Sequence, residues 1–478
     1  MKLVRFAQNQ WRSSSYSQPQ ISYSLFFSKP ISNSSLVRPR KSLYGKISEI
    51  GNPNVSIVPI LDQWVQEGNK VEAHELRDFI KEFRYFRRYH HALQISEWML
   101  NRRYIPPSQS DIAVRLNLIF KVHGLKPAEE YFDNVPKVLK GFPVYAALLG
   151  CYVDGNSVEK AEAVMEKIRK LGTLRFPYIH NHMMNIYYQS GNYEKLDDVM
   201  HEMKVGGIPY DTHTYGVRLS AYAAAFDVEG ITKIVGMAES DIPADLDCSF
   251  FAVAADGYLK VKQLNMALGM LRKLEERLNE AKRRNLAFNI LIKLYAKAGM
   301  KDEVYRIWNL YKAKEKVYNK GYLSMIGSLL KIDDINGAKS IFEEWESRKL
   351  PTDIRIPDLL VSAYSKKGLL EEAEAIIKKA VARGAGPSAF MWYYMARGYL
   401  KRGDIEQARE AIKKAISVCP LDGKLKKETL TACLEYLGVK GEKEGAEELI
   451  RLSDEDIFSA DTHEKLLSLV KNAEEQPI

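Results

Sequence analysis

The chain carries a tyrosine at nearly constant intervals along most of its 478 residues. Successive gaps are 35, 35, 36, 37, 69 and 35 residues, and in the wide gap Leu329 stands where a tyrosine is expected. A fixed period of this length indicates stacked supersecondary units, each covering the apolar face of the next. We therefore expect an extended repeated surface, rather than one pocket, to carry the function. The periodic residues are Tyr152, Tyr187, Tyr222, Tyr258, Tyr295, Tyr364 and Tyr399.

A small or aliphatic residue follows each tyrosine position by nine residues, with gaps of 33 to 38 over eleven units. Because the two series of residues have the same period and a constant offset, the repeat assignment does not depend on either series alone. We expect this second marker to lie where two helices cross, because helix axes that approach within about 8–10 Å leave little room for a side chain. The marker residues are Ala92, Ala128, Ala161, Leu196, Ile231, Ala267, Val304, Ala338, Ala373, Ala408 and Ala446.

Each unit reads as two short helices joined by a tight turn. In the unit that starts at Asn285, apolar residues recur at i, i+3, i+4 and i+7 from Phe288 to Tyr295, which is the pattern of a helix with one apolar stripe. Gly299 then ends that helix, and a second amphipathic pattern occupies residues 300–314. The sequence therefore predicts an all-α chain, a solenoid of about eleven αα-hairpins of 33–38 residues each.

The repeats suggest four segments. The repeat array spans residues 73–460, preceded by an N-terminal capping helix in residues 49–72. Residues 461–478 are expected to form a C-terminal capping helix and tail, and residues 1–48 a transit peptide or disordered segment.

The first 48 residues hold nearly all of the excess positive charge. Eight of the nine excess charges lie there, which leaves a formal charge of +1 on residues 49–478. No Asp or Glu precedes Glu49, and serine is frequent. Ser-rich segments with arginine and no acid are typical of organellar transit peptides. Because Arg5 and Arg12 flank apolar residues, we expect import into the mitochondrial matrix, with the chloroplast as the alternative. Cleavage is expected between residues 28 and 45. The alternative interpretation of the segment is a disordered basic tail.

The sequence excludes several classes of function. It has no run of 18 apolar residues and hence no expected membrane span. Its four cysteines lie far apart, and its histidines lack the spacing of a metal site. It also has no phosphate-binding Gly-Lys-Ser/Thr loop, no HExxH, no GxSxG and no zinc-deaminase signature. We therefore expect a protein that is not an enzyme and that binds no metal and no cofactor.

Two families of helical hairpins have periods of 34–35 residues, and the units resemble the pentatricopeptide repeat more closely than the tetratricopeptide repeat. The position four residues into the first helix, where the tetratricopeptide pattern has a small residue, is bulky here, as at Leu149, Met184 and Ile292. The segment HEMKVGGIPYDTHTYG, residues 201–216, is similar to the pentatricopeptide junction between units. Together with the N-terminus, the chain resembles a P-type pentatricopeptide repeat protein of plant mitochondria over residues 73 to about 460.

The resemblance implies a right-handed superhelix that binds single-stranded RNA, with one base read per repeat. The family's base readers are Asn, Ser or Thr at the fifth position of the first helix, together with the last residue of the repeat. Asn181, Asn289 and Thr431 fit the fifth position, and Asp211 is the last-position partner of Asn181. The partner of Asn289 is either Tyr318 or Asn319.

Most other fifth positions are Ala, Gly or Leu, whose side chains cannot hydrogen-bond a base edge. Phosphate contacts could come from Arg84, Arg87 and Arg88, from Lys260 with Lys262, or from the run 272–284, although each also reads as a solvated helix face. We expect an RNA-binding protein of mitochondrial RNA metabolism or translation. The alternatives are a structural component that contacts ribosomal RNA and mitochondrial ribosomal proteins, and a tetratricopeptide-like protein scaffold.

Overall fold

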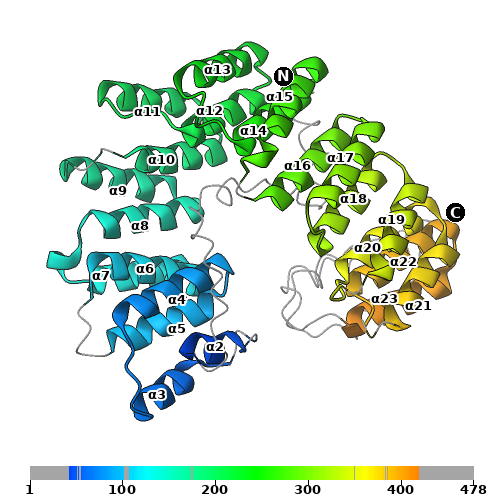
Figure 1. Ribbon diagram of the computed structural model, residues 1–478, viewed down its shortest axis with the longest axis horizontal. Coiled ribbons are helices and arrows are strands. Elements are labelled where there is room, and N and C mark those ends of the chain that lie inside the picture. Colours follow the sequence, from blue (N-terminus) through cyan, green and yellow to red (C-terminus); the bar gives the residue numbers. More distant parts are fainter. Residues whose placement is uncertain are drawn as a thin grey trace, which may run out of the picture. The chain divides into compact units, whose positions relative to one another are not determined.

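The computed structural model describes residues 42–418, except for positions 51, 53–54, 102–106, 173, 175, 282, 349, 383 and 385. These residues form helices, turns and loops, with no strand among them. They divide into two compact units, residues 1–273 and 274–478. The expected all-α fold of repeated hairpins is confirmed (Figure 1). The eleventh repeat and the C-terminal cap lie outside the described residues.

Six hairpins follow one another up to the end of the first unit, and α15 crosses the boundary into the second. We call the first helix of each hairpin its A helix and the second its B helix. The pairs are α4 (Ala73–Tyr85) with α5 (Tyr89–Leu100), α6 (Gln109–His123) with α7 (Leu125–Asn134), α8 (Phe142–Asp154) with α9 (Val158–Lys170), α10 (Pro177–Ser190) with α11 (Glu194–Val205), α12 (Thr212–Ala224) with α13 (Val228–Asp241), and α14 (Cys248–Lys260) with α15 (Leu264–Glu276).

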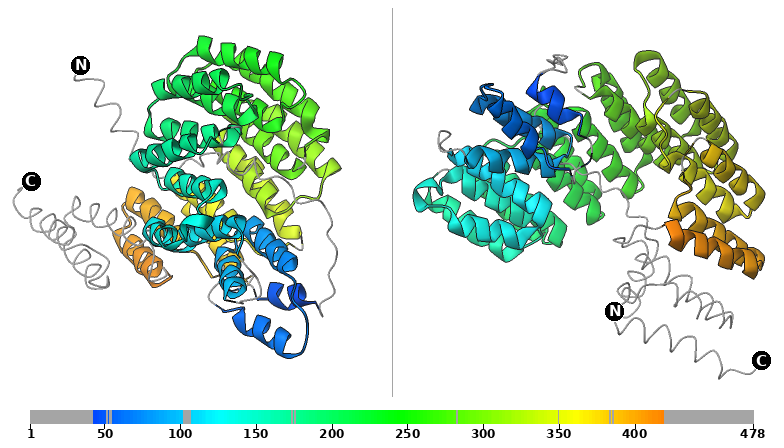
Figure 2. Two further views of the ribbon diagram at one scale, coloured as in Figure 1. Left: turned by 90° about the vertical axis from the view of Figure 1, so that its left-hand side faces the viewer. Right: turned by 90° about the horizontal axis from the view of Figure 1, so that it is seen from below.

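Four more hairpins form the second unit. They are α16 (Arg284–Lys297) with α17 (Lys301–Lys314), α18 (Asn319–Lys331) with α19 (Ile335–Ser347), α20 (Arg355–Lys367) with α21 (Leu370–Ala382), and α22 (Ala389–Arg402) with α23 (Ile405–Val418). Short 3-10 turns occupy Lys137–Leu139 and Arg277–Asn279. Successive A helices pack side by side from α6 to α14 in the first unit and from α16 to α22 in the second, and the B helices pack against these layers (Figure 2).

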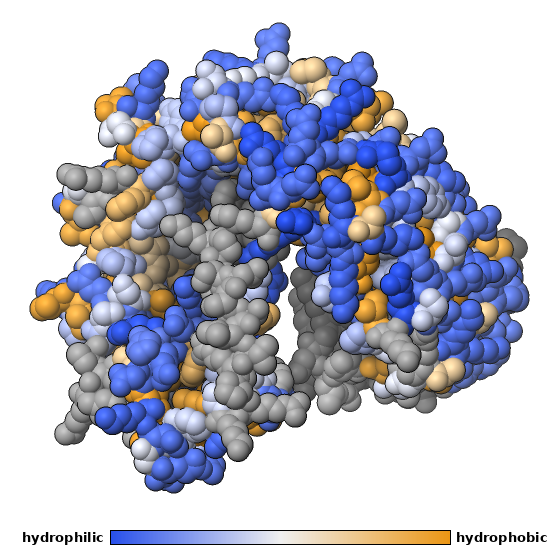
Figure 3. All heavy atoms as spheres, viewed as in Figure 1, coloured by the Kyte–Doolittle hydropathy of each residue, from blue (hydrophilic) through white to orange (hydrophobic). Residues whose placement is uncertain are grey.

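The crossing points inside the hairpins lie where the second sequence marker predicts them. All ten marker residues within the described part of the chain have no exposed surface, from Ala92 to Ala408. A larger side chain would push the two helix axes apart at these points. Hydrophobic side chains therefore gather between the helices, and hydrophilic ones cover much of α16–α23 on the face shown in Figure 3.

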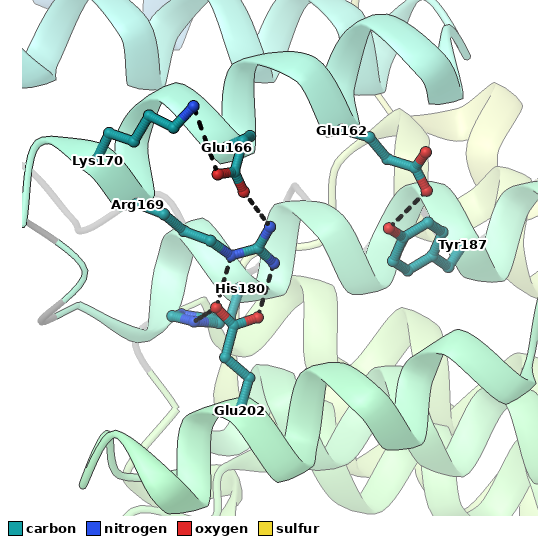
Figure 4. A network of polar contacts seen from close by, with 7 residues as sticks. All are labelled: Glu162, Glu166, Arg169, Lys170, His180, Tyr187 and Glu202. Carbon is teal, nitrogen blue, oxygen red and sulfur yellow. Dashed lines mark hydrogen bonds and ion pairs between the residues drawn. The ribbon is translucent and has the colours of Figure 1, made fainter.

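The periodic tyrosines are buried, with the exception of Tyr222, which is only partly buried and has the Arg218 guanidinium 4.0 Å from its ring centroid. Their hydroxyl groups have a role that the period does not indicate. Tyr187 donates a 2.9 Å hydrogen bond to Glu162 on the B helix of the preceding hairpin (Figure 4). Tyr399 does the same to Glu374. These tyrosines thus fasten one hairpin to the one before it.

Ion pairs between neighbouring B helices add further links. In Figure 4, Arg169 on α9 lies between Glu166 of its own helix and Glu202 on α11, which it contacts at 2.8 Å through Nε and Nη2. Glu202 also lies 4.0 Å from the buried His180 ring. Burial lowers the pKa of His180, and the carboxylate of Glu202 raises it in part. The hairpin-to-hairpin contacts therefore use polar groups on the B side and apolar packing in the interior.

Two short helices precede the first hairpin: α2 (Leu43–Ser48) and α3 (Val58–Gln66). Helix α2 occupies the last six residues of the segment 1–48, and residues 1–41 of that segment lie outside the described residues. Arg88 ties α2 to the array, since its guanidinium donates to the carbonyl oxygens of Ser48 and Ile50 and stacks 4.4 Å from the Phe83 ring centroid.

Candidate nucleic-acid interface

Two positions characterise the junction between one hairpin and the next. One is the fifth position of the A helix in the first hairpin, and the other is the N-cap residue of the next A helix, at the last position of the repeat. Asp211 is the N-cap of α12, and its carboxylate accepts from the backbone N–H of Thr214 at 2.8 Å. An Asp at an N-cap satisfies a backbone donor that the helix itself leaves unpaired.

The structure brings the predicted pair Asn181 and Asp211 together. The Asn181 amide donates to both carboxylate oxygens of Asp211, at 3.0 and 3.1 Å, and accepts a 2.8 Å bond from the Thr214 hydroxyl. Asn181 is 4% exposed. The pair therefore links hairpins four and five within one hydrogen-bonded cluster, and an RNA base would have to share or replace these bonds.

The ionisable group beside this pair is a histidine. His213 lies beside Asp211, and its ring nitrogen Nε2 is 2.9 Å from the Asn185 amide. Burial lowers the pKa of His213 to about 4, an effect that Asp211 opposes and His182 reinforces. The imidazole is neutral under physiological conditions, so the environment of Asn181 and Asp211 favours hydrogen bonding over charge attraction.

The structure also identifies the partner position of Asn289. Tyr318 is the N-cap of α18 and so corresponds to Asp211, whereas Asn319 is engaged with Pro351 and Trp345. Asn289 is 3% exposed, and its Oδ1 has no hydrogen-bond partner among the described residues. Asn289 thus offers one buried acceptor, but Tyr318, at the position that corresponds to Asp211, has an aromatic ring instead of a carboxylate. Thr431 lies outside the described residues.

Two other fifth positions make cross-hairpin bonds. Arg77 holds Asp111 with two bonds of 2.8 Å, and the Ser388 hydroxyl donates a 2.5 Å bond to Asp358. Burial raises the pKa of Asp358 to about 6, with a further contribution from Asp353 that the Ser388 bond partly offsets. A polar fifth residue therefore links hairpins at three junctions, whether or not it matches the family's readers.

Several cations in the three basic patches predicted from the sequence are already engaged within the protein. Arg88 anchors α2 through its two carbonyl bonds. Lys260 lies 3.3 Å from Asp256. In the run 272–284, Lys273 pairs with Glu239, Arg277 with Glu280 and Arg284 with Glu315. These contacts favour a structural role for most of the patches.

Basic residues are concentrated on the A helices of the second unit, as a separate count of charges for A and B helices shows. The four A helices of the second unit contain eleven Lys and Arg residues and one acid, Asp358. The four B helices of that unit contain ten basic and ten acidic residues. The six A helices that precede them contain seven basic and six acidic residues. The net charge of +1 for residues 49–478 thus conceals a formal charge of +10 on the four A helices of the second unit. Four of the eleven cations pair with acids outside the layer: Arg284, Arg355, Lys367 and Arg402.

Cations on this layer also crowd one another. Partial burial lowers the pKa of Lys366, and the nearby Arg397 and Lys401 lower it further. Partial burial and Lys320 act in the same way on the pKa of Lys293. Lys293, Lys320, Arg397 and Lys401 make no ion pair with any described residue. Because like charges in proximity are destabilising, such a cluster favours an anion in its neighbourhood.

The sequence held a signal for this layer that the segment-by-segment charge balance missed. A lysine stands two residues after five consecutive tyrosine positions, in the last turn of each A helix. In that turn lysine also stabilises the helix dipole, so the spacing alone does not distinguish the two roles. Lys293 and Arg397, which lie within their helices, do not have that explanation. The five lysines are Lys260, Lys297, Lys331, Lys366 and Lys401.

Within the described chain, no group of three or more His, Cys, Asp or Glu side chains is placed to hold a metal ion. No helix in the same residues is long and apolar enough to cross a membrane.

Comparison with known proteins agrees with the hairpin architecture. The family model described as PPR repeat matches residues 178–208, 286–314, 322–350 and 358–384. The chain is 38% identical over 417 residues to the pentatricopeptide repeat-containing protein At2g20710, mitochondrial, of Arabidopsis thaliana, covering 87% of this chain and 85% of that protein. It is 34% identical to At4g21705, mitochondrial, of the same plant, over 75% of this chain and 73% of the relative.

Among solved structures, the crystal structure of the pentatricopeptide repeat protein PPR10 from maize is similar, with a TM-score of 0.54 and 16% identity. The similarity covers 87% of this chain and 62% of the maize chain, so this chain spans about six-tenths of that protein's length. A PPR10 structure in complex with an 18-nucleotide psaJ RNA element has a TM-score of 0.53 at 17% identity. At these identities the structural likeness supports the fold.

Proposed function

Because the chain belongs to the pentatricopeptide repeat family, we propose that it binds single-stranded RNA along the A-helix layer of its hairpins. The observation that carries the proposal is the segregation of charge in the second unit, where the A helices hold a net +10 and the B helices are neutral. Phosphate contacts supply most of the sequence-independent affinity of proteins for nucleic acids. The RNA-bound PPR10 complex has the same kind of fold and supports this assignment.

In this proposal the second unit supplies the phosphate contacts, through Lys293, Lys320, Arg397 and Lys401. The Asn181–Asp211 pair in the first unit reads one base edge, and Asn289 reads another through its unpaired acceptor. The family's pairing assigns uracil to Asn181 with Asp211. Thr431 completes the set of proposed readers. Because the other fifth positions carry none of the family's Asn, Ser or Thr readers, the sequence-specific part of the footprint is short.

We assign the protein to mitochondrial RNA metabolism or translation, in the matrix, without catalytic activity. Several relatives carry "mitochondrial" in their names, and residues 1–48 have the composition of a transit peptide. The chloroplast is the second candidate location. The tetratricopeptide-like scaffold is disfavoured, since the repeats match the pentatricopeptide model.

Ultraviolet crosslinking in purified mitochondria, followed by sequencing of the RNA that copurifies with the protein, tests this function. We expect reads concentrated on one or a few messenger RNAs. Reads confined to ribosomal RNA, with cosedimentation of the protein and the ribosome, would instead select a structural role on the mitochondrial ribosome. Recovery of no RNA above the background of an uncrosslinked sample would contradict RNA binding altogether.

A further inference from the structure

Two large aromatic residues occupy N-cap positions at the last position of a repeat. Phe176 precedes α10 and Tyr318 precedes α18, and neither side chain caps its helix. Ser, Thr, Asp and Asn are the residues that normally occupy an N-cap, because their side chains accept a hydrogen bond from the first turn. Asp211, Asp247 and Ser388 do so in this chain. Helices α10 and α18 therefore begin without a side-chain hydrogen bond from their N-cap residue.

Both rings are also unusually exposed for their size. Phe176 is 53% exposed and Tyr318 is 52% exposed, although large aromatic side chains normally bury most of their surface. The Phe176 ring lies 6.3 Å from Phe142 and 6.1 Å from Tyr178, between ring centroids, so neighbouring rings hold it in place while about half of its surface remains open. Above Tyr318, the Lys316 ammonium lies 5.5 Å from the ring centroid.

The position of the two rings specifies what could contact them. Asp211, which occupies the corresponding place one hairpin after Phe176, contacts the fifth-position side chain of its junction, Asn181. At the junction of Phe176 the fifth position is Ala146, which offers no hydrogen-bonding side chain. At the junction of Tyr318 it is Asn289, whose buried Oδ1 lacks a partner among the described residues. The polar pair of one junction is thus replaced by an aromatic face at the two others.

We propose that Phe176 and Tyr318 are stacking platforms for RNA bases. Phe176, at the end of hairpin three, binds any base without selecting its identity, and Tyr318, at the end of hairpin seven, selects it only weakly. Every base has a π-face, so a ring at this place binds all four bases, whereas a polar pair distinguishes them by hydrogen bonding. Lys316 adds a cation beside the second platform, where a phosphate or the face of a base can approach it. The inference rests on the proposed RNA binding and adds the class of contact at two junctions.

The structure offers a substitution that separates stacking from folding. Phe176→Ser and Tyr318→Ser remove the rings but supply the N-cap that α10 and α18 lack, so helix stability should not fall on that account. Phe226→Ser is the matched control: Phe226 is 72% exposed but lies in the turn between α12 and α13, at the other end of an A helix. The conservative Phe176→Trp and Tyr318→Trp variants keep an aromatic face.

The test is fluorescence anisotropy of the full chain with oligouridylate and oligoadenylate at low salt, with thermal unfolding recorded for each variant. We expect each serine variant to weaken binding by about 5- to 150-fold, equivalent to about 1–3 kcal/mol for one stacked base. The Phe176→Ser variant should lose affinity for oligouridylate and for oligoadenylate to a similar extent. The tryptophan variants and Phe226→Ser should bind as the unmodified protein does.

Three results would overturn the inference. If the double serine variant binds both oligonucleotides as tightly as the unmodified protein, the rings are not stacking platforms, while RNA binding itself stands. If the serine variants lose affinity only in proportion to a lowered unfolding temperature, the rings serve packing. If the unmodified protein binds neither oligonucleotide, the proposed function fails together with this inference.

Discussion

At the scale of single residues, the candidate base readers are part of the fold before any RNA arrives. Asn181 bonds to Asp211 and Thr214, and Asp211 simultaneously caps α12. Replacing Asp211 by Ala would therefore combine the removal of a cap with the removal of a reader, and the two effects could not be separated. Asn is as good an N-cap as Asp, which makes Asp211→Asn the informative substitution.

We expect Asp211→Asn to keep the cap of α12, to lower the unfolding temperature only slightly through loss of one bond from the Asn181 amide, and to alter base preference at one nucleotide. The physical reason is that an amide presents a donor where the carboxylate presents only acceptors, which inverts part of the pattern offered to the base edge. A polar contact of this kind is worth about 1–3 kcal/mol of discrimination. Selection of bound RNAs from a random pool, with the unmodified protein as reference, measures it; an unaltered preference would assign the residue to capping alone.

The sequence predicts that Asn181 and Asp211 meet, because the repeat phase fixes which residues of adjacent hairpins are neighbours. It leaves two possible partners for Asn289, since only the backbone shows that Tyr318 is the N-cap of α18 and Asn319 its first residue. The tyrosine period also does not predict the hydroxyl bonds to Glu162 and Glu374. Such bonds depend on which B-helix side chain lies within reach, and the period of the apolar residues carries no information about that.

At the scale of helices, charge opposes the fold at the junction between α20 and α22. Asp358 receives the Ser388 hydroxyl and has a pKa raised to about 6 by burial. A carboxyl whose folded-state pKa exceeds its unfolded value binds more protons in the native state. Ionisation of Asp358 therefore lowers the free energy of unfolding as pH rises from about 4 to 6. The full loss of stability is present above that range.

Asp358→Asn should remove this deficit, because the amide is neutral and still offers an oxygen to Ser388. We expect the variant to gain about 1–3 kcal/mol in unfolding free energy at pH 7.5 and nothing at pH 4. Hydrogen exchange of the α20 and α22 amides measures the effect locally, which suits an array whose hairpins need not unfold together. A variant less stable than the unmodified protein at pH 7.5 would contradict the expectation.

Asp353, which lies a few residues earlier in the chain, provides a control of opposite sign. Its pKa is lowered by the Arg355 guanidinium, so its stabilisation is present at neutral pH and is lost as pH falls. Asp353→Asn should therefore lower stability at pH 7.5, in contrast to Asp358→Asn.

At the scale of the whole molecule, the segregation of charge between layers explains why composition alone misled. The repeat predicted every described hairpin, since apolar period and glycine termination are local properties of the chain. The net charge summed along the sequence is near zero, however, because each basic A helix of the second unit is followed by a B helix of mixed charge. Only the assignment of residues to layers shows that one face is basic.

The salt dependence of RNA binding tests that central claim most directly. The informative variant replaces Lys293, Lys320, Arg397 and Lys401 by Gln, which removes four A-layer cations that make no ion pair within the described chain. The control replaces four exposed B-helix lysines by Gln, Lys314, Lys339, Lys378 and Lys414, for the same change in net charge.

We predict that the A-layer variant binds oligouridylate more weakly and that its plot of log affinity against log salt becomes shallower. The slope should fall by about 0.7 for each phosphate that the variant no longer neutralises, or about 3 in all. The B-layer control should keep both the affinity and the slope of the unmodified protein. Equal losses of affinity in the two variants would mean that net charge alone attracts the RNA, and an unchanged slope in the A-layer variant would contradict the assignment of the RNA to the A-helix layer.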